Sequence, residues 1–243
     1  MKTYIAVSIA SVSIIIASFF FGSSIKSKFK KTNSISVKGL GTIDFESDLI
    51  VWKASFGKKS TSLKDAYARL EYDRKKIETH LINKGISKKE MVYSSIEIRK
   101  DYKSVYDKKT EQSSSIFTGY KLTQSVTVES KKVNLVEDVS RKITELITSD
   151  IEINSYAPSY YYTKLADLKI KMIASATKDA KNRAKTIAVN AGANLGILKK
   201  ATMGVFQITG RNSSDDYSWG GTYNTSSKLK TASITMRLEY LTE

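Results

Sequence analysis

The first 33 residues have a different hydrophobic pattern from the rest of the chain. No charged side chain stands between Lys2 and Lys26, and residues 4–22 form an apolar run interrupted by four serines. As a helix this run would be about 28 Å long, enough to cross the hydrocarbon core of a bilayer. Because residues 22–24 resemble a signal-peptide cleavage site only weakly, we predict an uncleaved anchor over residues 4–24, with a cleaved signal as the alternative.

The charges beside this run oppose export of the rest of the chain. Four lysines follow the run, whereas only Lys2 and the α-amino group precede it. By the positive-inside rule, this asymmetry holds the body of the protein in the cytoplasm. The same lysines suit a solvated tether beside the membrane, so residues 1–33 are interpreted as an anchor followed by a basic tether. The four are Lys26, Lys28, Lys30 and Lys31.

Residues 34–243 show the alternation of a strand-rich domain. Apolar side chains alternate along 35–45 and 50–56, which predicts two strands joined as a hairpin by a short turn at Asp48. Two longer strands follow at 92–106 and 117–129, and the polar stretch between them predicts a flexible hairpin tip. Three further strands are predicted at 151–157, 195–209 and 229–241.

Three amphipathic helices lie between these strands. They are predicted over residues 63–84, 135–147 and 164–191. The first has the spacing of a capping box at Ser62 and Asp65, and Gly85 is placed to end it in the left-handed conformation. Asn134 and Glu137 are expected to cap the second helix.

The third helix carries a stripe of small side chains. Four alanines recur every four residues, so they share one face of the helix and let its axis approach a sheet or another helix closely. The stripe consists of Ala176, Ala180, Ala184 and Ala188, with Ile173, Ile187 and Ala191 beside it. The opposite face holds Lys178, Lys181, Arg183 and Lys185, which we interpret as a solvated face rather than a strip that binds nucleic acid.

Composition narrows the possible chemistry. The 243 residues are 41% apolar and 26% charged, enough for a sizeable core, and the net charge of +16 is spread along the chain. Without cysteine, the chain has no disulfide, thiolate metal site or cysteine nucleophile. Its single histidine, His80, stands at the apolar edge of the first helix and is expected to be structural.

No sequence motif points to a reaction. The pair Gly39 and Gly41 lacks the third glycine of a dinucleotide fingerprint, and neither a phosphate loop nor a nucleophile elbow is present. Asp215 and Asp216 could bind a hard cation, but adjacent acids in a polar loop are usually a solvated turn. We therefore expect no catalytic residue, no cofactor and no bound metal.

The chain resembles the SIMPL-domain family of exported bacterial envelope proteins in several ordered motifs. The segment 37–41 followed by Asp48 is similar to the family's glycine-rich first strand and the Pro-Asp pair that starts its second, and Gly119 with Tyr120 resembles its Gly-Tyr strand entry. The strongest match is 176–196, where Ala176, Ala180 and Ala184 lie in the alanine-rich helix and Gly192 and Gly196 in its exit. Two departures are Ser47 in place of the usual proline and Ser149-Asp150 where glycine is common.

This resemblance implies an α+β fold with largely antiparallel strands, preceded here by the hydrophobic N-terminal helix. It also implies location on the periplasmic side of the cell envelope, ring-like or channel-like oligomers in some members, links to stress resistance, and no conserved catalytic apparatus. We therefore expect a homo-oligomer that binds no specific nucleic acid and is attached to the inner membrane by residues 4–24. Other protein partners are not indicated.

Two aromatic clusters are the candidate contact residues. Tyr160, Tyr161 and Tyr162 precede the third helix, and Tyr217, Trp219 and Tyr223 lie in segment 209–227, which has no regular period. Aromatic side chains beside small, adaptable neighbours are common in protein interfaces. The alternatives are that the tyrosines pack in the core and that the loop is disordered. For the whole protein, the alternatives to self-assembly or partner binding are a basic protein that binds polyanions or membrane surfaces, and an enzyme.

Overall fold

The computed structural model describes residues 18, 33–107 and 112–242, and these fall into two compact units. The terminal unit comprises the described residues of Met1–Leu40 with Ala176–Gly204 and Thr235–Glu243. The central unit comprises Gly41–Ser175 and Val205–Ile234. The anchor expected over 4–24 lies, apart from residue 18, outside the described residues, and so does most of the basic tether.

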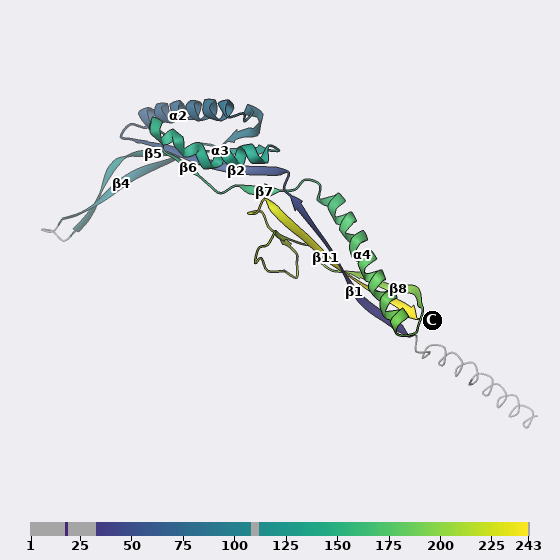
Figure 1. Cartoon of the computed structure of the whole chain (residues 1–243). Coiled ribbons are helices and arrows are strands. Elements are labelled where there is room, and N and C mark those ends of the chain that lie inside the picture. The colour runs from purple at the N-terminus through teal and green to yellow at the C-terminus, as the bar shows by residue number, and fades with distance from the viewer. Residues whose placement is uncertain (1–17, 19–32, 108–111, 243) are drawn as a thin grey trace, which may run out of the picture. The chain divides into compact units, whose positions relative to one another are not determined.

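A six-stranded sheet with two helices on one face forms most of the central unit (Figure 1). Its strands pair antiparallel in the order β3-β5-β2-β6, with β4 paired to β5 and β7 paired to β2. The strands are β2 Leu49–Ser60, β3 Met91–Tyr93, β4 Glu97–Asp107, β5 Gln112–Ser130, β6 Ile153–Ser155 and β7 Ser159–Tyr161. The helices are α2 Leu63–Asn83 and α3 Val133–Lys142, which continues as a 3-10 helix over Ile143–Ser149.

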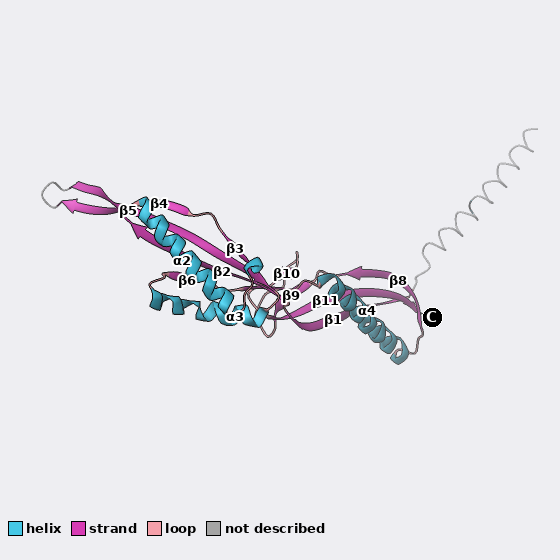
Figure 2. Cartoon of the chain, turned by 90° about the horizontal axis from the view of Figure 1, so that it is seen from above, coloured by secondary structure: helices cyan, strands magenta, loops and turns pink. Residues whose placement is uncertain are grey.

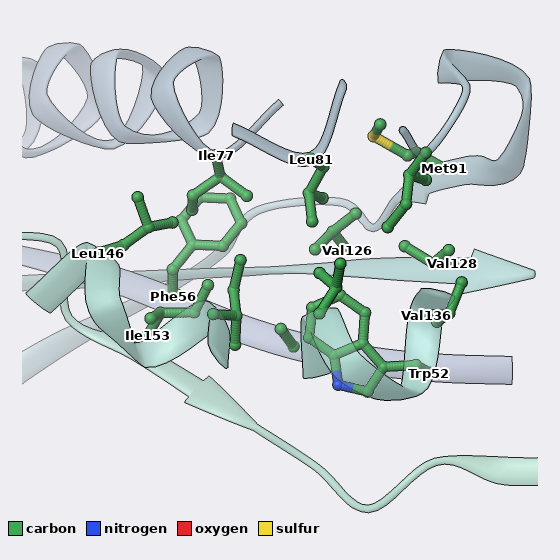
Figure 3. Close-up of a cluster of buried hydrophobic side chains, with 14 of the residues drawn as sticks. Trp52, Phe56, Ile77, Leu81, Met91, Val126, Val128, Val136, Leu146 and Ile153 are labelled. Atoms are coloured by element: carbon green, nitrogen blue, oxygen red, sulfur yellow. The ribbon is translucent and has the colours of Figure 1, made fainter. Parts of the chain in front are cut away.

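The core of the central unit fills the space between this sheet and its helices (Figure 3). Alternate residues of β2 point toward the helices, and Trp52 lies opposite Val128 of β5 in the antiparallel register. Ile77 of α2 and Val136 of α3 cover them, each fully buried. The alternation of apolar side chains thus determines which face of the sheet the helices cover.

The predicted hairpin between the first two strands is wrong. β1 Ser34–Glu46 and β2 belong to different sheets and do not pair. The two linking residues make their bonds elsewhere: the N–H of Ser47 donates to the carbonyl of Lys228, and that of Asp48 to the carbonyl of Tyr161, each at 3.0 Å. The link therefore moves the chain from one sheet to the next instead of closing a turn.

The ends of α2 are confirmed. The hydroxyl of Ser62 accepts a hydrogen bond from the N–H of Asp65, and Gly85 follows the helix with a φ of +93°. In a complete capping box the carboxylate of Asp65 would accept a hydrogen bond from the N–H of Ser62. Here it accepts instead from the hydroxyl of Ser60, at 2.7 Å.

The expected cap of the second helix is wrong. α3 starts at Val133, its N-cap is Lys132, and no side chain caps it. Asn134 lies inside the first turn, where its side-chain oxygen accepts from the ammonium of Lys228. Glu137 instead pairs with Arg141 one turn later, at 2.6 Å. Both predicted capping residues are therefore occupied by other partners.

A second sheet contains the first and last strands. β11 pairs with β1, β8 and β9, and the two-residue β10 runs parallel to β9. The bounds are β8 Leu195–Met203, β9 Gln207–Gly210, β10 Thr222–Tyr223 and β11 Leu229–Thr242. Two predicted strands are each divided in the structure, 92–106 into β3 and β4 and 195–209 into β8 and β9. The α+β class with mostly antiparallel strands and three α-helices is confirmed for the described chain.

The third helix is α4 Leu165–Asn190, and its part from Ala176 onward belongs to the terminal unit, where it lies against β1 and β11 (Figure 2). All four alanines of the stripe are fully buried, as predicted, whereas Ile187 is 48% exposed and lies off the contact face. A Cβ built on Gly39 would stand 2.2 Å from the carbonyl oxygen of Ala176 and 2.4 Å from the nitrogen of Ala180. The helix axis thus approaches the strand so closely that only glycine fits beneath the alanines.

Candidate functional site

The two aromatic clusters predicted from the sequence meet in the central unit. The phenol oxygen of Tyr223 in β10 accepts a hydrogen bond from the N–H of Tyr162 at 3.3 Å. The rings of Tyr223 and Tyr161 have centroids 6.5 Å apart, and Tyr162 stacks at a tilt on Phe45 at 4.8 Å. Segments about 60 residues apart in the sequence therefore form one aromatic cluster.

Tyr160 faces the opposite way from its neighbours. It is buried, its hydroxyl donates to the Glu137 carboxylate at 3.1 Å, and its N–H donates to the carbonyl of Thr225 at 2.7 Å. Burial, and then the nearby Glu137 carboxylate, raises the pKa of this phenol. Tyr160 therefore belongs to the core and presents little surface to a partner.

Trp219 is the most exposed large hydrophobic side chain among the described residues. It is 100% exposed, and Tyr217 beside it is 69% exposed. The turn that carries Trp219 is held by hydrogen bonds: Ser218 exchanges two with the side chain of Gln207, and the N–H of Gly221 returns to the carbonyl of Ser218 at 3.1 Å. The indole is therefore presented to solvent from a fixed backbone.

The loop behind this turn is organised around a buried lysine that the sequence reasoning missed. Lys230 is fully buried, and its ammonium donates to the carbonyls of Asn224 and Ser227, each at 2.5 Å. Burial lowers its pKa to about 8, and the Asp215 carboxylate partly opposes that shift. The available signal was its register, because Lys230 occupies the same face of β11 as Ala232 and Ile234.

The carboxylate of Asp215, considered from the sequence as a cation ligand, is bound within this loop. It accepts from the N–H of Gly210 and from the side-chain amide of Asn224, each at 2.8 Å. The hydrogen bond from Gly210, followed by that from Ser213, lowers the pKa of the carboxyl. Across the ranges that the structure describes, no group of three potential metal-ligating side chains occurs.

The residues that carry the family resemblance in the central unit have structural roles, in turns and in close packing. Asp48 accepts from the N–H and the hydroxyl of Thr163, at 2.7 and 2.8 Å. Gly119 has a φ of +138°, and a Cβ there would stand 2.5 Å from the carbonyl oxygen of Ser60. Tyr120 packs against the core beside Phe117, with ring centroids 5.2 Å apart.

The other residues of the family pattern are in or near the terminal unit. Gly41 is buried in β1, and Ala176, Ala180 and Ala184 lie on the buried face of α4. Gly192 follows α4 with a φ of +71°, and Gly196 is half-buried in β8. These residues shape the fold, and none of them presents a reactive group.

His80 is half-buried on α2, in agreement with the packed position expected. Its Nε2 has no hydrogen-bond partner among the described residues, and burial lowers the pKa of the ring.

No helix among the described residues is both long enough and apolar enough to span a membrane.

The fold is that of an α+β protein with two sheets, and its family follows from direct comparison. The model of the SIMPL family, described as a protein of unknown function, matches residues 35–236. The chain therefore belongs to the SIMPL family, as the sequence motifs indicated. No curated protein matches it.

Proposed function

We propose that this SIMPL-family chain is a non-enzymatic envelope protein that acts through self-assembly or partner binding. The contact is assigned to the loop aromatics, defined as Tyr217, Trp219 and Tyr223. Envelope stress resistance is the role that the family resemblance suggests. The proposal is supported chiefly by one observation, the complete exposure of Trp219 on a hydrogen-bonded turn.

A fully exposed indole on a fixed backbone suits a contact residue. Tryptophan and tyrosine are enriched among the residues that dominate binding energy at protein interfaces. Because the Ser218–Gln207 hydrogen bonds already hold the turn, binding requires little further ordering of the backbone. Tyr217 is likewise positioned, since its hydroxyl lies 3.2 Å from that of Ser233.

The proposal is tested with Trp219→Ser in the full chain, kept in mild detergent. Because the indole makes no buried contact, the variant should keep the wild-type unfolding temperature while its self-association weakens at least about thirtyfold, as for an interface hot spot. Tyr72→Ser on α2 is the matched control, because Tyr72 is also exposed, at 59%. Equal association constants for the wild type and both variants would remove the loop aromatics from the contact.

We also propose that the folded part lies on the periplasmic side of the inner membrane, anchored by residues 4–24. The apolar run and the family resemblance support this location. The four lysines that follow the run oppose it, because the positive-inside rule would keep them in the cytoplasm. Protease added to spheroplasts should then digest residues 34–243. Full protection until the inner membrane is lysed would place them in the cytoplasm, and a mature chain that begins near Ile25 would show a cleaved signal.

A basic surface in the terminal unit favours polyanion binding as the second candidate function. Lys38, Lys200 and Arg237 line a hollow of about 490 Å³. Lys38 and Arg237 alternate with the buried residues of β1 and β11, so they lie on the face of the sheet away from α4. Glu239 in the same hollow is paired with Lys199 at 2.8 Å.

Salt dependence separates this second candidate from the first. If these three cations contact a polyanion, binding should fall with salt at a logarithmic slope of about −2 to −3, and Lys38→Gln with Arg237→Gln should reduce that slope. Self-association that is independent of salt would favour the loop aromatics instead.

A further inference from the structure

A hollow of about 590 Å³ opens at the N-terminal end of α3, within the central unit. The link between β1 and β2 forms one wall through Ser47 and Asp48, and the first turn of α3 forms another. Lys131, Lys132 and Lys164 lie around it. The loop aromatics and the basic surface of the terminal unit share no residue with this hollow.

The helix end in this hollow is uncapped. The N-cap residue is Lys132, and no side chain accepts a hydrogen bond from the first turn of the helix. The first N–H groups of a helix have no partner within the helix, and the helix dipole makes this end positive. The N–H groups of Val133, Asn134 and Leu135 are therefore available to an anion.

A second observation, independent of the helix, is the hydroxyl of Ser47. This residue is only 4% exposed and lines the hollow. Among the residues that the structure describes, none donates a hydrogen bond to its Oγ or accepts one from it. A buried hydroxyl without a partner is disfavoured, so a group inside the hollow that accepts its proton would stabilise the arrangement.

The charges around the hollow also favour an anion. Its two carboxylates are engaged: Glu46 pairs with Lys228 at 3.3 Å, and Asp48 accepts two hydrogen bonds from Thr163. Lys131 and Lys164 form no ion pair with another described residue. An oxyanion in the hollow would thus meet two uncommitted ammonium groups.

We propose that this hollow binds a small oxyanion of the phosphate type. Its oxygens would accept hydrogen bonds from the first turn of α3 and from Ser47, while Lys131 and Lys164 balance its charge. A proline at position 47, as in the Pro-Asp pair that this segment resembles, would supply no hydroxyl. The site therefore depends on a residue in which this chain departs from the family pattern.

The test is calorimetric titration of the full chain in mild detergent with inorganic phosphate, at constant ionic strength in chloride. We expect saturable binding of one phosphate per chain. Ser47→Ala should weaken it about tenfold, and so should the double variant Lys131→Gln with Lys164→Gln. Lys178→Gln with Lys181→Gln on the exposed face of α4 is the matched control, and it should change the affinity less than twofold.

Three outcomes would overturn the proposal. These are no saturable binding by the wild type, wild-type affinity in Ser47→Ala, and equal weakening by the control pair. Thermal unfolding of each variant without phosphate is measured alongside. Ser47→Ala removes only an unpartnered buried hydroxyl, so it should unfold at the wild-type temperature or slightly above it, and its lost affinity then reports on the site itself.

Discussion

The N–H of Tyr162 donates a hydrogen bond to the phenol oxygen of Tyr223 at 3.3 Å, which joins the end of β7 to β10. The same two segments are joined again where the N–H of Tyr160 donates to the carbonyl of Thr225. β10 also pairs with β9, so within the central unit the strand that follows Trp219 is held by β9 and by the end of β7. These attachments explain how an otherwise polar loop can present an indole in a fixed position.

The close contact along α4 predicts that larger side chains in the alanine stripe destabilise the fold. Ala180→Leu and Ala184→Leu should each lower the free energy of unfolding by about 1–3 kcal/mol, since both positions are fully buried and Ala180 also lies close to Gly39. Lys181→Leu on the exposed face should have a much smaller effect. Chemical denaturation measures all three, and equal effects would contradict the assigned contact face.

Two glycines with positive φ should differ in their tolerance of a side chain. Gly119→Ala places a Cβ 2.5 Å from a backbone oxygen in addition to its strained φ, and should lower the free energy of unfolding by about 3 kcal/mol or more. Gly192→Ala meets nothing within 4 Å, so only its left-handed conformation opposes alanine, at about 1 kcal/mol. Urea denaturation of both variants would contradict this account if the two losses were equal.

Lys230 predicts a stability change at alkaline pH. Its folded pKa of about 8 lies below its ordinary value of 10.5, so between these two values the unfolded chain binds more protons than the folded chain. Stability contributed by this group therefore rises with pH across that window and is constant below it. Relative to Lys230→Met, the wild type should gain up to about 3 kcal/mol from about pH 8 to about pH 10.5.

The comparison with Lys230→Met also supplies the control for this prediction. Every other titratable group is present in both proteins, so its contribution cancels in the difference between the two free energies of unfolding. Urea denaturation at several pH values gives that difference. A difference that does not change with pH would show that Lys230 keeps its ordinary pKa in the folded state.

Local signals were sufficient for the helices and insufficient for the pairing of strands. The ends of α2 follow from Ser62 and Gly85, which act within one turn of the helix. The hairpin prediction failed because β1 pairs with β11, nearly the whole chain away, and no local pattern encodes that choice. The division of 195–209 follows likewise from β11, which β8 and β9 meet at different positions.

The candidate sites show the same division. Composition identified the aromatic residues of both clusters, but their meeting depends on the parallel pairing of β9 with β10, a tertiary feature. The register of β11 placed Lys230 on an apolar face, although only the fold shows the two carbonyls that accept hydrogen bonds from its ammonium. The sequence could not show that the hydroxyl of Ser47 lacks a partner. Its surroundings are formed by three segments, 46–48, 131–135 and 163–164, which only the fold brings together.

Self-association through the loop aromatics can be measured as the mass of the wild-type full chain in solution. Sedimentation equilibrium in density-matched mild detergent, over a wide range of protein concentrations, gives this mass without a contribution from the detergent. We expect a discrete multiple of the 27.1 kDa chain, with the mass of Trp219→Ser shifted toward that of the single chain at the same concentrations. A wild-type mass of one chain at every concentration would contradict it.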